Sequence, residues 1–268
     1  MKEINIGALQ LPTLGMNYDR LDFYCKKAHE RECKLLLLGE YVINHFFKEL
    51  ITIPKRMVKD QTTNHLKKLK EFSKEYNITI VAPFVEIKKD KIYKKVVKLS
   101  PKSTSYAMQQ ILINYPHWDE ESFFDNPVAK LTEPMIFSLE GFKFAVIFGF
   151  ELHFDYFWDI VRRKRVDIVL LPTASTFGSK QRWQELICSR AFINSCYILR
   201  ANRVGDYYED EIKWHFYGES MLVNPDGKIE MKLEDKESML IEPVSKEVLS
   251  YHKRAWGFLN HLRRRGEI

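Results

Sequence analysis

The sequence has no apolar run of the length that a membrane span or a secretory signal requires. Its first twelve residues, MKEINIGALQLP, alternate between apolar and other side chains as a β-strand does. A membrane-spanning helix needs roughly twenty consecutive apolar residues, and a secretory signal needs a longer apolar core than this segment offers. We therefore expect a soluble, cytoplasmic chain with no membrane partner.

Cysteine is scarce, with four residues in 268. No pair has the close spacing of a metal knuckle, and thiols stay reduced in the cytosol. The sequence therefore predicts free thiols, mostly buried, at all four positions: Cys25, Cys33, Cys188 and Cys196.

An excess of one charge is also absent, since 42 basic residues face 36 acidic ones and the formal net charge is +6. Such an excess is too small to indicate a dedicated nucleic-acid surface. Two short basic runs occur, RRKR at Arg162–Arg165 and RRR at Arg263–Arg265. Runs of this length are typical of solvated faces or helix ends, and binding to nucleic acid or to an acidic partner is the weaker alternative.

Alternating strand and helix patterns predict one α/β domain over residues 1–268, with no repeat and no linker. Apolar residues at helical spacing indicate helices around residues 21–28, 69–76, 154–161 and 181–196. The predicted strands are Ile4–Leu11, Leu35–Leu38, Ile78–Ile87, 91–101, a hairpin turning at Glu140–Gly141, Val166–Leu171, Tyr197–Ala201, Phe216–Val223 and Met239–Ile241. The segment Ser103–Leu131 is less regular, and we interpret it as a strand end followed by a long loop.

Chemically active residues follow three of the buried strands. Glu40 ends the run LLLLGE, Glu151 lies just beyond FAVIFGF, and Thr173 and Ala174 follow IVLLP. Ligands of open α/β sheets bind outside the carboxyl ends of the strands. Because a buried carboxylate is costly unless it is paired or has a chemical role, Glu40 is either a salt-bridge partner or a functional residue.

The order of these segments resembles the nitrilase superfamily of carbon–nitrogen hydrolases over nearly the whole chain. The shared features are the early ALQLP strand, the strand ending in Glu40, the segment FGFELHF followed by IVLLPTA, RANRVG and FYGES. Gly39 stands where the family usually has proline. The resemblance is closest to N-carbamoylputrescine amidase and ω-amidase types, and it implies a four-layer α-β-β-α sandwich.

Carried onto this sequence, the family's catalytic triad is incomplete. Glu40 takes the position of the general base, but Gly149 takes the position of the nucleophilic cysteine. The catalytic lysine falls in INYPHW, most simply at Tyr115 with His117 beside it, and no lysine occurs between Lys102 and Lys130. Loss of the nucleophile removes the covalent route, and loss of the lysine removes the main charge that stabilises the oxyanion.

The resemblance also indicates which residues surround the site. A second pocket glutamate is either Glu120 or Glu121, and Glu151 is expected to form a scaffold ion pair. The remaining predicted binding residues are His117, Phe150, Glu151, Phe154, Thr173 and Ala174. A metal at Glu151, His153 and Asp155 is a weak alternative because these side chains would not share one helix face. We therefore expect neither a metal nor a cofactor.

The leading hypothesis is a degenerate family member with little or no amidase activity that binds a small amide or ureido ligand or regulates another protein. The alternative is an active hydrolase of short amides or N-carbamoyl amines. There Glu40, Glu120 or Glu121, and Glu151 would form a carboxylate cluster that activates water, with Tyr115 as the acid. The resemblance further implies a homodimer or higher homo-oligomer, with the aromatic helix FDYFWDIV as a possible interface.

Overall fold

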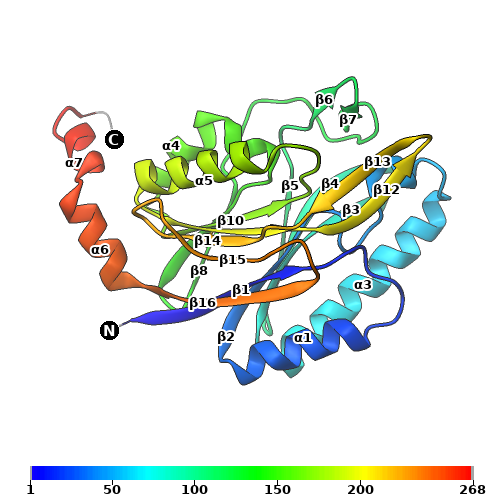
Figure 1. Ribbon diagram of the computed structural model, residues 1–268, viewed down its shortest axis with the longest axis horizontal. Helices are drawn as coiled ribbons and strands as arrows, with labels where there is room; N and C mark the ends of the chain where they lie inside the picture. Colours follow the sequence, from blue (N-terminus) through cyan, green and yellow to red (C-terminus); the bar gives the residue numbers. More distant parts are fainter. Residues whose placement is uncertain (1, 267–268) are drawn as a thin grey trace.

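The computed structural model describes residues 2–266 and contains two six-stranded sheets packed face to face (Figure 1). In spatial order, the first sheet contains β16 (Ser238–Ser245), β1 (Glu3–Gln10), β2 (Cys33–Leu38), β3 (Thr79–Lys88), β4 (Lys91–Leu99) and β5 (Thr104–Met108). The second contains β15 (Ile229–Lys232), β14 (Met221–Val223), β11 (Tyr197–Asn202), β10 (Ile168–Thr173), β9 (Phe142–Val146) and β8 (Met135–Leu139).

Helices cover the outer face of each sheet. The helices α1 (Asp19–Glu30) and α3 (Lys55–Glu75) lie against the first sheet, and α4 (Asp155–Arg163) and α5 (Lys180–Asn194) lie against the second (Figure 1). The layers therefore run helix, sheet, sheet, helix. This arrangement confirms the predicted α-β-β-α sandwich.

Strand residues alternate between the two buried surfaces, which explains why the inner strands are apolar throughout. On β2, Leu35 and Leu37 point into the core between the sheets, whereas Leu36 and Leu38 pack toward α1 and α3. The same alternation holds on β10, where the core between the sheets receives Ile168 and Leu170. Both faces of β2 and β10 are apolar, so the polar residues that these two strands contribute lie at or just beyond their ends.

The rest of the chain forms small elements around the ends of the sheets. They are α2 (Phe47–Leu50), β6 (Asn114–Tyr115), β7 (Trp118–Asp119), η1 (Phe150–His153), β12 (Val204–Glu209), β13 (Ile212–Tyr217), α6 (Lys246–Ala255) and α7 (Phe258–Arg263). The segment 103–131, interpreted as mostly loop, also supplies the edge strand β5. The predicted strand Phe216–Val223 is wrong as a single strand, because Gly218 and Glu219 have φ values of +68° and +58° and separate β13 from β14.

The aromatic face of α4 is buried inside this chain. Phe157 and Trp158 have no exposed surface and pack with Ile187 and Ala191 of α5. These side chains belong to the core between α4, α5 and the second sheet. Phe157 and Trp158 are therefore core residues, whereas Tyr156 on the same helix is 40% exposed. The interface at α4 and the homo-oligomer itself stay predictions.

Within residues 2–266, no helix combines the length and the apolar character needed to cross a bilayer. The four cysteines are free thiols, as predicted. Cys25, Cys33 and Cys196 are buried, and Cys188 is partly exposed.

Candidate functional site

The candidate site lies where the ends of β2 and β10 meet across the two sheets. The Glu40 backbone N–H donates to the carbonyl oxygen of Thr173 at 3.1 Å, which ties the residue after β2 to the last residue of β10. A Cβ on Gly39 would come within 3.0–3.2 Å of backbone atoms of Arg203, Thr173 and Ala201. Because these atoms belong to the backbone and have little freedom to move, the close packing explains a glycine just before Glu40.

A buried lysine joins two buried carboxylates at this point. Lys94 of β4 forms ion pairs with Glu40 and with Glu120, where the distance from Nζ to Oε1 is 2.7 Å. The Tyr41 hydroxyl also donates to Glu120 Oε1, and the Lys94 ammonium lies 4.7 Å from the centroid of the Tyr41 ring. Glu40, Lys94 and Glu120 are at most 5% exposed. We call these three residues the Glu–Lys–Glu cluster.

Asn126 and Gln109 fix the backbone that carries Lys94. Asn126 Oδ1 accepts from the Lys94 backbone N–H at 2.8 Å, and its Nδ2 donates to the carbonyl oxygens of Lys94 and Gln109 at 2.9 and 2.7 Å. The Gln109 backbone N–H donates to the Lys94 carbonyl at 3.1 Å. The loop that contains Asn126 therefore acts as a side-chain clamp on the strand that supplies the lysine.

Burial and neighbouring charges both shift the pKa values of Glu40 and Lys94. Burial raises the pKa of Glu40, and the nearby Glu120 raises it further, while Lys94 partly offsets both. Burial alone would lower the pKa of Lys94, but the charges of Glu120 and Glu40 outweigh burial and raise it. The lysine is therefore held as an ammonium between the two carboxyl groups.

Gly149 contacts Glu40 directly. The Gly149 backbone N–H donates to Glu40 Oε1 at 3.1 Å, and a Cβ added at Gly149 would lie 3.0 Å from that same oxygen and 3.1 Å from Thr173 Cγ2. The backbone at Gly149 is right-handed, with φ −49° and ψ −52°, a conformation open to any residue. Glycine is thus not required by the backbone here, and the Glu40 carboxylate fills much of the space that a side chain would use.

The Glu–Lys–Glu cluster opens into a small inner cavity and then into a wider outer pocket. The inner cavity has a volume of about 40 Å³ and is lined by Glu40, Lys94, Gln109, Ile113, Trp118, Glu120, Gly149, Phe150, Thr173, Ala174 and Trp183. The outer pocket has a volume of about 460 Å³ and shares Ile113, Trp118, Phe150, Ala174 and Trp183 with it. The shared side chains form a mostly aromatic boundary between a polar end and a roomier mouth.

Three side chains that line the inner cavity each carry a buried polar atom with no hydrogen-bond partner among the described residues. These atoms are the acceptors Glu120 Oε2 and Gln109 Oε1 and the donor Trp118 Nε1. Buried polar atoms are nearly always satisfied, since leaving one unpaired costs about 1–3 kcal/mol. Unpaired atoms on side chains that line a cavity therefore point to a ligand or water as their partner.

Most of the residues singled out at the strand ends come together in the inner cavity. Glu40, Gly149, Phe150, Thr173 and Ala174 all line it. Of the two neighbouring acids that the sequence left open, Glu120 lies in the cavity and has no exposed surface, whereas Glu121 is exposed. The structure thus selects Glu120 as the second pocket glutamate.

Tyr115 and His117 lie outside the inner cavity, in the outer pocket. Tyr115 is 47% exposed, and its ring stacks on His117 with the centroids 5.9 Å apart. The conclusion that the site lacks a lysine is wrong, because Lys94 reaches Glu40 from β4. The sequence reasoning considered only the segment between Lys102 and Lys130, while the lysine comes from the preceding strand.

Glu151 supports the loops and lies outside the inner cavity. Its carboxylate accepts backbone N–H groups of Gln110 at 2.6 Å, Ile111 at 3.4 Å and Phe148 at 3.2 Å. Burial raises the pKa of Glu151 to about 7 despite these hydrogen bonds. The expected ion pair is wrong: within residues 2–266, Glu151 has hydrogen bonds but no cationic partner. Phe154 packs against Phe150, with ring centroids 5.4 Å apart, and lines neither the inner cavity nor the outer pocket.

The alternative carboxylate cluster with Tyr115 as acid is not assembled. Glu40 and Glu120 share Lys94, Glu151 is bound to backbone amides, and the Tyr115 ring lies in the outer pocket. No group of three or more metal-ligating side chains comes together in the part of the chain that the structure describes. The residues that sequence reasoning missed are Lys94, Gln109, Trp118 and Asn126.

Comparison with known families and proteins identifies the family. The family described as Carbon-nitrogen hydrolase matches residues 5–252. Among individual proteins, a deaminated glutathione amidase from Synechocystis sp. (strain PCC 6803 / GT-S) is 22% identical over 205 residues, which cover 72% of this chain and 74% of the relative.

Solved structures share the fold at low identity. A carbon–nitrogen hydrolase from Helicobacter pylori G27 has a TM-score of 0.83 and 17% identity, with 96% of this chain and 94% of that chain covered. A cysteine-to-alanine mutant of the amidase from Nesterenkonia sp. AN1, in complex with butyramide, has a TM-score of 0.76 and 16% identity, with 95% of each chain covered. At such identities these structures establish the fold alone.

Proposed function

This chain belongs to the carbon–nitrogen hydrolase family, and from that premise we propose that it binds a small amide or ureido compound without hydrolysing it through a covalent intermediate. The observation that carries the proposal is the pairing of Gly149 with a complete Glu–Lys–Glu cluster. The charged end of a family site is retained, while the position beside Glu40 offers a backbone N–H in place of a nucleophile.

The hydroxyl of Thr173, whose methyl group lies beside Gly149, is already hydrogen-bonded to other residues. Thr173 Oγ1 donates to Asn202 Oδ1 at 2.8 Å and accepts from Arg200 Nε at 3.1 Å. Among the described residues that line the inner cavity, there is no cysteine or serine. Covalent catalysis needs an activated nucleophile within hydrogen-bond reach of its base. This arrangement therefore supports binding rather than acyl transfer.

The unpaired atoms of the inner cavity match an amide group. An amide NH₂ can donate to Glu120 Oε2 and Gln109 Oε1, while its carbonyl oxygen can accept from Trp118 Nε1. A cavity of about 40 Å³ is several times the roughly 10–15 Å³ that one water requires, so it has room for such a head group. A ureido group offers the same carbonyl with a second nitrogen, and it satisfies the same atoms.

The outer pocket has the size and lining for the remainder of the ligand. Its volume of about 460 Å³ is within the range of small-molecule sites, which begins near 300 Å³. Tyr115, His117, Phe150, Phe177 and Trp183 make it largely aromatic. We propose that an aliphatic or aromatic tail occupies this pocket while the amide head enters the inner cavity.

The test is calorimetric titration with butyramide, the short amide found in complex with the cysteine-to-alanine mutant of the Nesterenkonia sp. AN1 amidase. We expect saturable binding at one site per chain. Glu120→Gln and Trp118→Phe should each weaken binding about tenfold, because the first replaces a charged acceptor with a neutral amide and the second removes the indole N–H donor. Glu121→Gln is the matched control, since this neighbouring acid is exposed.

Thermal melting of each variant separates loss of binding from loss of fold. Trp118→Phe removes the indole N–H donor and leaves the ion pairs of Lys94 intact. It therefore tests binding independently if Glu120→Gln destabilises the Glu–Lys–Glu cluster. Absence of saturable binding by the unaltered protein would overturn the proposal. An equal loss in Glu121→Gln would also overturn it.

A further inference from the structure

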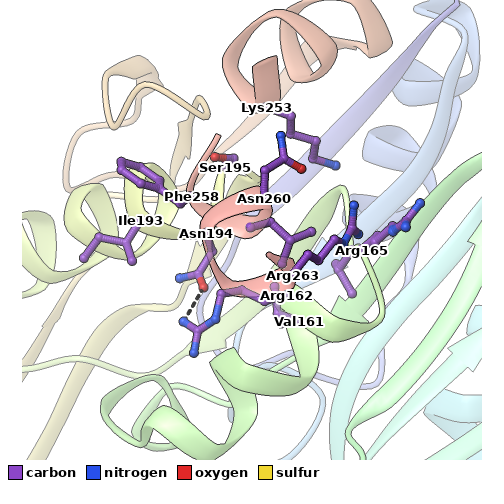
Figure 2. Close-up of a pocket in the computed structure, with 12 residues that line it drawn as sticks. Val161, Arg162, Arg165, Ile193, Asn194, Ser195, Lys253, Phe258, Asn260 and Arg263 are labelled. Carbon is purple, nitrogen blue, oxygen red and sulfur yellow. Dashed lines mark hydrogen bonds between the residues drawn. The ribbon is translucent and has the colours of Figure 1, made fainter. Parts of the chain in front are cut away.

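Two basic segments far apart in the sequence meet at a second cavity. The cavity has a volume of about 180 Å³ and lies between the ends of α4 and α5 and the C-terminal helices α6 and α7 (Figure 2). Its cationic lining residues are Arg162, Arg165, Lys253 and Arg263, and no aspartate or glutamate lines it. It shares no lining residue with the inner cavity or the outer pocket.

The two basic runs send only some of their side chains into this cavity. Within RRKR, Arg163 pairs with Asp159 at 2.7 Å and Lys164 pairs with Glu133 at 2.6 Å, and neither lines the cavity. Arg162 and Arg165 are turned toward the cavity instead. The first and last members of this run therefore line the cavity, whereas the two middle members form surface ion pairs.

The charges that face the cavity are incompletely balanced. Asp159 lies 3.7 Å from Arg162 but is shared with Arg163, and Asp167 lies 3.1 Å from Lys253 but is shared with Lys246. Arg165 and Arg263 have no ion-pair partner within the described residues 2–266. Like charges held close together repel, so an anion bound among them would lower the energy of the folded chain.

One donor in this cavity is buried without a partner. Arg162 Nη1 donates to Asn194 Oδ1 at 3.1 Å, which holds the guanidinium in place (Figure 2), while Arg162 Nε has no hydrogen-bond partner among the described residues. Asn260 of α7 also lines the cavity and supplies an amide. Arginine presents its donors in a planar fork that matches phosphate and carboxylate oxygens.

Apolar side chains complete the lining. Val161, Val166, Ile193, Phe258 and Leu259 line the cavity together with the cations, and Figure 2 shows Ile193 and Phe258 at the end away from Arg165. The wall made by α7 is anchored to α5, since the Phe192 ring packs against Trp256 and Phe258 with centroids 5.0 and 5.5 Å away. The lining therefore combines cationic and apolar side chains.

The geometry points to a binding site for a small organic phosphate monoester, with its phosphate between Arg162, Arg165 and Arg263 and its apolar part against Ile193 and Phe258. Three arginines and a lysine favour a dianion over a monoanionic carboxylate, since each added negative charge is attracted by all of them. The volume of 180 Å³ is below the roughly 300 Å³ at which drug-sized pockets begin, so the ligand is small.

The experiment is calorimetric titration of the full chain with phenyl phosphate, inorganic phosphate and benzoate in parallel. We expect saturable binding of phenyl phosphate, at least tenfold tighter than that of benzoate and of inorganic phosphate. Arg165→Gln and Arg263→Gln should each weaken it about tenfold or more. The matched controls are Arg163→Gln in the first run and Arg264→Gln in the second, which should change it less than twofold.

Each outcome decides a separate part of the proposal. Absence of phenyl phosphate binding, or an equal loss in the control variants, overturns the site. If benzoate binds as tightly as phenyl phosphate, the site does not select a phosphate group. If inorganic phosphate binds as tightly as phenyl phosphate, the apolar side chains do not contribute to binding. Arg263 lies in α7, whereas Arg165 follows α4. If both variants weaken phenyl phosphate binding with unchanged thermal melting, the loss comes from the binding site and not from displacement of α7.

Discussion

Replacing Lys94 with methionine removes the only ammonium that the structure places between Glu40 and Glu120. Methionine keeps the chain length but leaves two buried carboxyl groups without a counter-charge. At an effective dielectric constant of about 20, charges 2.7 Å apart, the Lys94–Glu120 distance, attract by about 6 kcal/mol. Desolvation of the ammonium offsets part of this, and breaking a buried pair from one side typically costs about 3–5 kcal/mol.

We expect Lys94→Met to lose about 3–5 kcal/mol of unfolding free energy at pH 8, a large part of the roughly 5–15 kcal/mol of a typical folded protein. Burial already raises the pKa of Glu40, and without the ammonium this pKa rises further above its value in the unfolded chain. Stability that depends on protonation of Glu40 is present at low pH and lost as the pH rises through its folded pKa. The deficit relative to the unaltered protein should therefore shrink at pH 5.

The assay is urea unfolding at pH 5 and pH 8, followed by circular dichroism. The double variant Lys94→Met with Glu120→Gln removes one charge from each side and should recover at least 1 kcal/mol relative to Lys94→Met alone. A loss below 1 kcal/mol in Lys94→Met, or an equal loss at the two pH values, would refute the reasoning. Either result would mean that Lys94 is not the counter-charge of the cluster.

Two further changes test the supports of the site. Burial raises the pKa of Glu151 to about 7. Its contribution to stability is therefore present below about pH 4.5 and is lost as the pH rises to 7. Glu151→Gln should remove a few kcal/mol of this pH dependence, whereas Glu121→Gln should leave it unchanged. Asn126→Ala should lose about 2–4 kcal/mol in urea unfolding, because backbone groups of Lys94 and Gln109 lose their partners. The exposed Asn114→Ala is the control, and equal losses in the two would contradict the role of Asn126.

The layered fold could be predicted because its signals are local. Each buried strand is an uninterrupted apolar run, and each outer helix shows apolar residues at helical spacing. The break between β13 and β14 could not be predicted, since Glu219 adopts a positive φ that carries no composition signal. Short elements such as β6 and β7 depend on packing against distant aromatics and not on their own pattern.

The candidate site was predictable only where its residues follow a strand. Glu40, Thr173 and Ala174 come directly after buried runs, so position along the chain indicated them. Lys94 occupies a core-facing position of β4, in line with Ile92 and Val96. A lysine in such a position is a signal of a buried ion pair, but its partners lie 54 residues before it and 26 after it, and only pairing of the strands brings them together.

Trp118 and Gln109 illustrate a second limit of sequence reasoning. Both side chains line the inner cavity, and each has one buried polar atom without a partner among the described residues. An unpaired atom is a property of the finished packing, and nothing in the neighbouring sequence marks it. The same holds for the meeting of Arg162 and Arg165 with Arg263, which depends on how α7 folds back over α5.

The central claim is that this family member binds amides but lacks covalent turnover, and the most direct test measures both on one sample. Purified protein is titrated with butyramide by calorimetry, and ammonia release is then followed in the same solution, with Glu40→Gln alongside. We predict one saturable site and ammonia release no greater than that of Glu40→Gln. Steady ammonia release by the unaltered protein that disappears in Glu40→Gln would contradict the account.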